Sequence, residues 1–126
     1  MLKTLAFIAA GGALGAMMRF LSQATVYELV GKTFPYGTLF VNVTGSFLMG
    51  LLSIFLVEKF NLGAEWHLAI LVGVLGSFTT FSTFSIETLV LFEQGDMLKA
   101  MTNILLSVVL CVAAVWMGAF LAKQLI

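Results

Sequence analysis

The stretch Gly76-Ser-Phe-Thr-Thr-Phe-Ser-Thr-Phe-Ser85 carries three phenylalanines, six hydroxyl side chains and no charge. It lies inside a long apolar run, roughly residues 67–92. As one helix this run would be about 39 Å long, whereas the hydrocarbon core of a bilayer is about 30 Å thick. The run must therefore tilt or break. A break would be tolerated at Gly73, Gly76 and the hydroxyl cluster, because glycine weakens a helix and hydroxyls satisfy backbone groups that a break frees.

The composition of the whole chain places it in a membrane. Of its 126 residues, 61% are hydrophobic and only 10% are charged, whereas a soluble domain carries about 25% charged residues. So few polar side chains cannot cover a surface that faces water. The length predicts one domain, residues 1–126. The net charge of zero argues against a nucleic-acid partner, which requires a basic surface.

Four segments are long and apolar enough to cross a bilayer, which takes about 20 residues. The first begins like a signal peptide, but its apolar pattern continues, so we interpret it as a span. Glycine, proline and charged residues separate the segments. The prediction is an all-α membrane protein of four transmembrane helices, near residues 4–27, 36–57, 67–92 and 99–122.

The basic residues show no bias that would orient the chain in a membrane. Four spans put Lys3, Lys59 and Lys123 on one side, and Lys32, Lys99 and Arg19 toward the other. An excess of Lys and Arg on one side normally sets the orientation. Either another signal orients this chain, or it inserts both ways and pairs with an inverted copy of itself.

Several polar groups fall within the predicted spans. Arg19 lies over halfway along the first span, where it either extends its side chain to the interface or is buried and donates to backbone carbonyls or helps to hold an anion. Glu87 is near the end of the third span, so a vestibule or interface position is as plausible as a functional one. Gly11 and Gly15 form a GxxxG step that predicts close helix packing.

Amide and hydroxyl groups in the second and fourth spans have two possible roles. Asn42 forms a helix–helix hydrogen bond or faces a polar path. Asn103 and Ser107 are four residues apart and share a helix face, which serves either packing or the same path. Cys111 has no partner for a disulfide in this chain and is interpreted as a core or lipid-facing residue.

The phenylalanines and hydroxyls of the opening stretch suit a small anion. A phenyl edge carries positive charge in its quadrupole, and hydroxyls donate hydrogen bonds without binding an anion too tightly. Ordinary packing, with hydroxyls bonded back to the helix, is the alternative. A break at this depth would also free carbonyl groups, which are good cation ligands.

Three motifs, together with the four-span length, resemble the Fluc (CrcB-type) fluoride channel family. They are GGALGAMMRF at 11–20, GTLFVNVTGSFLMG at 37–50 and GVLGSFTTFSTFS at 73–85. The resemblance implies a passive fluoride channel of the bacterial inner membrane that exports fluoride and so relieves its toxicity. It also implies an antiparallel, dual-topology homodimer embedded in lipid, with a third helix broken in mid-membrane.

The resemblance also implies roles for individual residues, none of them catalytic. The third-span break would hold a structural sodium ion shared by both subunits, through backbone carbonyls of Gly76 and Thr79. Arg19 matches the family's first-span arginine, which we expect to attract anions or to stabilise the structure. The expected fluoride pathway comprises Asn42, Phe81, Ser82, Thr83, Phe84 and Ser107.

The main alternative is a small proton-coupled exporter of multidrug or guanidinium type. Such chemistry needs a membrane-embedded carboxylate in the first span, but this span contains Arg19 and no acid before Glu28 at its end. A non-transporting assembly subunit would not need the hydroxyl column. No nucleophile–base pair suggests an enzyme.

Overall fold

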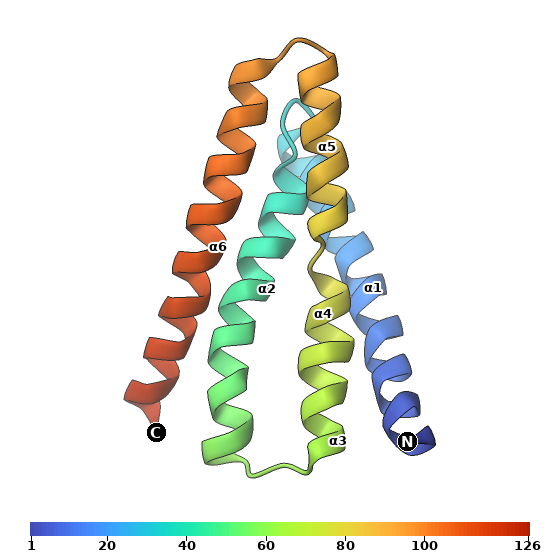
Figure 1. Ribbon diagram of the computed structural model, residues 1–126, viewed down its shortest axis with the longest axis vertical. Coiled ribbons are helices and arrows are strands. Elements are labelled where there is room, and N and C mark those ends of the chain that lie inside the picture. The colour runs from blue at the N-terminus through green and yellow to red at the C-terminus, as the bar shows by residue number, and fades with distance from the viewer.

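The computed structural model describes all residues, 1–126, and every regular element is helical (Figure 1). Four helical stretches are long and apolar enough to cross a membrane: Leu2–Val30, Tyr36–Lys59, Ala64–Glu93 and Met97–Leu125. They contain the four predicted spans, so that prediction is confirmed. The elements are α1 (Leu2–Val30), α2 (Tyr36–Ile54), η1 (Phe55–Lys59), α3 (Ala64–His67), η2 (Leu68–Leu75), α4 (Gly76–Phe78), α5 (Phe81–Glu93) and α6 (Met97–Leu125), where η denotes π-helix.

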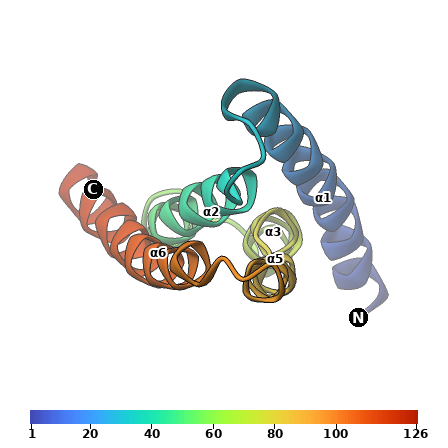
Figure 2. The same cartoon turned by 90° about the horizontal axis from the view of Figure 1, so that it is seen from above.

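The helices run up and down, with α2 between α6 and the segmented third span (Figure 2). Both termini and the turn from η1 to α3 lie at one end of the molecule, and the other two turns lie at the opposite end (Figure 1). The first helix, α1, packs along η2 and α4, and the most extensive packing joins α2 to α6. The lysines are therefore divided between the ends as the sequence predicts.

Glycines allow the closest helix contacts. A Cβ atom on Gly11 would collide with the carbonyl of Ala69, and one on Gly15 would collide with the carbonyl of Val74. The GxxxG step thus brings α1 directly onto the backbone of η2, and its predicted packing role is confirmed. Side-chain packing replaces the hydrophobic effect as the main attraction between helices in lipid.

The third span is interrupted at Thr79 and Thr80, between α4 and α5. Both residues are extended, with ψ angles of 158° and 110°. The family resemblance places the break over Gly76 to Thr79, but Gly76 keeps helical dihedrals, φ −62° and ψ −30°. The break therefore lies at the C-terminal end of the expected range and one residue beyond it, where Asn42 of α2 hydrogen-bonds to Thr80.

Candidate functional site

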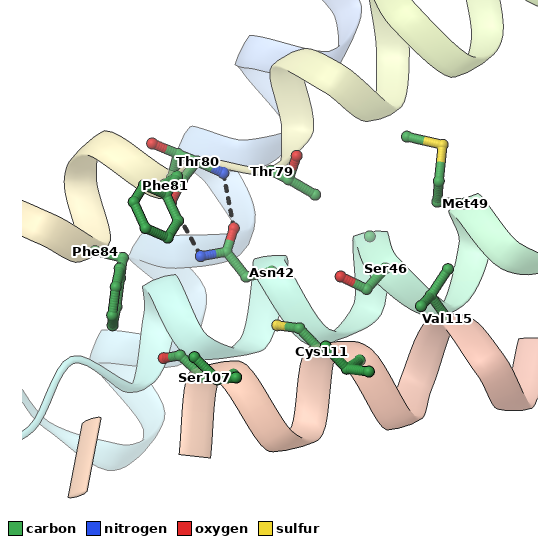
Figure 3. Close-up of a pocket in the computed structure, with 13 residues that line it drawn as sticks. Asn42, Ser46, Met49, Thr79, Thr80, Phe81, Phe84, Ser107, Cys111 and Val115 are labelled. Carbon is green, nitrogen blue, oxygen red and sulfur yellow. Dashed lines mark hydrogen bonds between the residues drawn. The ribbon is translucent and has the colours of Figure 1, made fainter. Parts of the chain in front are cut away.

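Asn42 on α2 holds the break open. Its Oδ1 atom accepts a 2.7 Å hydrogen bond from the backbone N–H of Thr80, and its Nδ2 atom donates a 3.0 Å bond to the carbonyl of the same residue (Figure 3). One amide side chain therefore satisfies both backbone groups of a residue that the helix has left unpaired. This meets the strict requirement for backbone pairing at membrane depth.

The Thr80 hydroxyl then starts the next helix. It accepts a 3.2 Å hydrogen bond from the backbone N–H of Thr83 and donates a 2.9 Å bond to the hydroxyl of that residue. In a continuous helix, the N–H groups of Thr80 and Thr83 would bond to the carbonyls of Gly76 and Thr79. Because both N–H groups are engaged elsewhere, those two carbonyls lose their ordinary helical partners.

A cavity of about 420 Å³ lies beside the break, between α2, α5 and α6 (Figure 3). None of the 13 residues that line it is charged. Its polar groups are hydroxyls, one amide and one thiol, so it offers hydrogen-bond donors without a carboxylate that would repel an anion. These polar residues are Asn42, Ser46, Thr79, Thr80, Ser107 and Cys111.

Two phenyl rings form the wall of this cavity at the start of α5 (Figure 3). The ring centroids of Phe81 and Phe84 are 5.2 Å apart, and the ring planes are tilted by 51°. Phe84 is 8% exposed, whereas Phe81 is 76% exposed. One ring is therefore fixed by the core of this chain, and the other stands open at its surface.

The predicted pathway residues are only partly brought together. Asn42, Phe81, Phe84 and Ser107 share the cavity, whereas Ser82 and Thr83 are not among its lining residues. Ser82 is exposed and Thr83 is partly exposed, both in the first turn of α5. Arg19, which we expected to attract anions or to stabilise the structure, is partly exposed on α1. It takes part in neither of the two ion pairs of the chain.

A second polar cluster joins three helices near the opposite end from the termini. Gln23 Nε2 donates a 3.0 Å hydrogen bond to the hydroxyl of Thr38, which in turn donates a 2.7 Å bond to Oε1 of Glu87. Glu87 also lines a cavity of about 330 Å³ together with Lys32 and Lys99. The carboxylate therefore lies in a vestibule-like position, one of the two that the sequence left open.

Sequence reasoning missed part of the cavity. Ser46 and Thr80 line it, and Cys111 also faces it rather than lying only in core or lipid. Ser46 is four residues after Asn42, so it shares that helix face, and this spacing was the available signal. Nothing in the sequence pattern distinguishes Thr80 from the neighbouring hydroxyls, because its role depends on contact with α2.

Four membrane-length helices, three of which border an uncharged cavity, define the class of small multi-pass membrane proteins. A model of the family described as CrcB-like protein, Camphor Resistance (CrcB), matches residues 6–119. The chain belongs to this family, which is a family of ion channels and not of enzymes.

Three relatives illustrate the similarity, each named fluoride-specific ion channel FluC. The protein of Methylococcus capsulatus is 60% identical over 118 residues, 94% of this chain and 52% of that protein. The protein of Shewanella amazonensis is 51% identical over 112 residues, 89% and 90% of the two chains. The protein of Geobacter metallireducens is 45% identical over 122 residues, 97% and 98%. The chain thus spans about half of the first relative and about nine tenths or more of the other two.

Proposed function

We propose that this protein is a passive channel that conducts fluoride across a bacterial inner membrane. The observation that carries the proposal is the uncharged cavity at the break, where Asn42, Phe81, Phe84 and Ser107 converge. The relatives named as fluoride-specific channels support the choice of ion. Fluoride that enters a cell as the neutral acid and is trapped as the ion would leave through such a path, which relieves its toxicity.

The proposed path uses weak neutral contacts. Hydroxyl groups and the Asn42 amide donate hydrogen bonds, and the tilted phenyl rings can turn their positive edges toward an anion. A neutral lining binds an ion weakly enough for it to leave again, which conduction requires. At the end of the molecule, Lys32 and Lys99 line the second cavity; Lys99 pairs with Asp96 at 3.1 Å, so Lys32 is the lysine whose charge would attract anions there. Passage of fluoride along this path does not require the coupled transport of a proton.

The geometry also supports an antiparallel homodimer in lipid. The cavity wall at Phe81 is open to the outside of the chain, so a second subunit would close it and complete the path. The lysines are divided almost equally between the two ends of the molecule, which is compatible with insertion in both orientations. We propose that two inverted copies pair in the membrane.

The break fits the sodium ion that the family resemblance implies. The carbonyls of Gly76 and Thr79 have lost their helical partners to Asn42 and to the Thr80 hydroxyl, and Gly76 is exposed on the single chain, so a second subunit could approach it. Carbonyl oxygens suit a hard cation. The ion would link the two breaks of a dimer and place a positive charge that favours anions nearby.

Fluoride efflux from liposomes tests the function. Liposomes that contain the purified protein are loaded with potassium fluoride, valinomycin is added, and external fluoride is followed with an electrode. We expect fast release of fluoride and little release when chloride replaces it. Absence of release from a folded, dimeric protein would exclude the channel. A proton-coupled exporter of cations would then be tested, although α1 offers no acid except Glu28 near its end.

The sodium proposal has a separate test. The purified dimer is dialysed into potassium or N-methylglucamine salts, and its thermal unfolding and molar mass are measured by calorimetry and light scattering. We expect the unfolding midpoint to fall when sodium is removed and to recover when it is restored, because an ion that binds only the native state stabilises it. An unchanged midpoint over a wide range of sodium concentrations would contradict the proposal.

A further inference from the structure

A chain of hydrogen bonds connects the cavity wall to the interior of α5 and α6. The Ser107 hydroxyl lies 3.4 Å from Oδ1 of Asn103, and the Nδ2 atom of Asn103 lies 3.0 Å from the hydroxyl oxygen of Thr88. The Thr88 hydroxyl lies 2.7 Å from the carbonyl of Phe84. Only Phe84 and Ser107 line the cavity, whereas Asn103 is 1% exposed.

The direction of every bond in this chain is set by one carbonyl. The Phe84 carbonyl can only accept, so the Thr88 hydroxyl must donate its single proton to it. Thr88 can then only accept from Asn103, which requires the Nδ2 side of the amide to face it. The Oδ1 side is left toward Ser107, and Oδ1 can only accept. The Ser107 proton is therefore drawn into the network and away from the cavity.

We propose that Thr88 and Asn103 are positioning residues that hold the Ser107 proton in an internal hydrogen bond and thereby weaken its binding to an anion in the cavity. This inference rests on the proposed function. The internal bond, at 3.4 Å, is longer than the usual range for hydroxyl donors. An arriving anion can replace Asn103 Oδ1 as the acceptor of the Ser107 hydrogen bond. Asn103 Oδ1 then competes with the anion for this hydrogen bond, which favours release of the anion.

Such competition matches the needs of a channel. An ion that bound to several donors without competition would stay in the site, and conduction requires that it leave quickly. The network supplies an alternative acceptor that is already buried and aligned. The Ser107 hydroxyl thus alternates between the anion and Asn103 Oδ1 as its acceptor at a small cost in free energy, because it has a hydrogen-bond acceptor in both states.

The substitution Thr88→Val tests the network. It removes the acceptor of Asn103 Nδ2, so the amide can turn and donate to the Ser107 oxygen, which leaves the Ser107 proton free for the cavity. The initial rate of fluoride efflux is measured against internal fluoride concentration. We expect the half-saturating concentration to fall about three- to tenfold, the equivalent of one hydrogen bond, with a lower maximal rate. Thr88→Ser keeps the hydroxyl and should restore wild-type values.

Two controls separate this role from a general structural effect. Thr25→Val is the matched control, because the Thr25 hydroxyl donates a 2.9 Å bond to the carbonyl four residues earlier, at an exposed position away from the cavity. It should leave both kinetic values unchanged. In a Ser107→Ala background the network has no proton to hold, so Thr88→Val should change the half-saturating concentration no further.

The outcomes decide between the claims. Wild-type half-saturation in folded Thr88→Val, or an equal shift in the Ser107→Ala background, would overturn the positioning role while the channel function stands. Absence of fluoride efflux in the wild-type protein would instead remove the proposed function and this inference with it. If Thr88→Val does not fold, Asn103→Leu is measured in its place. It should lower the half-saturating concentration in the same way, and unchanged kinetics would again overturn the role.

Discussion

At the scale of single residues, Phe81 and Phe84 share the cavity but are held differently. We expect Phe81→Ile and Phe84→Ile each to reduce fluoride efflux by about tenfold or more, because isoleucine lacks a positive ring edge. Phe84→Ile should also lower the free energy of unfolding of the chain, by about 1 kcal/mol, since Phe84 is buried within it. Efflux per folded protein and thermal unfolding measure the two effects. Wild-type efflux in either variant would argue against ring-edge contacts.

Asn42 pairs with both backbone groups of Thr80 and also lines the cavity. Asn42→Ala leaves the N–H and carbonyl of Thr80 unpaired, at a cost of about 1–3 kcal/mol for each group. We expect a lower unfolding midpoint and loss of efflux. In acidic buffer, where the carboxyl is protonated, Asn42→Asp can still accept from the Thr80 N–H and donate to its carbonyl, so it should there be more stable than Asn42→Ala. Equal stability of the two variants would contradict the assigned hydrogen bonds.

At the scale of elements, the contact of α1 with η2 requires glycine at position 15 but not at position 12, one turn earlier. A Cβ atom on Gly15 would collide with the Val74 carbonyl, whereas one on Gly12 would meet only the Ser77 hydroxyl at 3.4 Å. Gly15→Ala should lower the free energy of unfolding by about 1–3 kcal/mol. Gly12→Ala, the matched control, should change it little. Thermal unfolding in detergent distinguishes them, and equal midpoints would contradict the packing.

The break between α4 and α5 offers a second pair of positions to compare, Thr79 and Thr80. The Thr79 hydroxyl only bonds back to the Leu75 carbonyl at 3.1 Å, whereas the Thr80 hydroxyl caps α5. Thr79→Val should keep efflux within about twofold, because such back-bonding adds little to a helix. Thr80→Val should destabilise the protein by about 1 kcal/mol, as loss of a helix cap does, and reduce efflux. A large loss in Thr79→Val would assign a role to its hydroxyl.

At the scale of the whole molecule, we expect the even division of basic residues between the two ends to govern orientation. A cysteine placed at Gln94 in a Cys111→Ser background should react with an impermeant thiol reagent from either side of the membrane, about half from each. Two lysines added at Asn61 and Leu62, in the turn between η1 and α3, should bias the labelling strongly to one side. Labelling of the unmodified charge pattern from one side only would contradict dual topology.

The sequence by itself determined the four helices, the presence of a break and the kinds of side chain at the site. Span length, apolar composition and the GSFTTFSTFS stretch are local properties, and lipid leaves the backbone few alternatives to a helix. Only the tertiary structure decided that the break falls at Thr79 and Thr80, that Ser82 and Thr83 lie outside the cavity, and that Asn103 reaches Thr88. These features depend on which side chains of α2 and α6 meet α5 in space, and helix periodicity does not encode that contact.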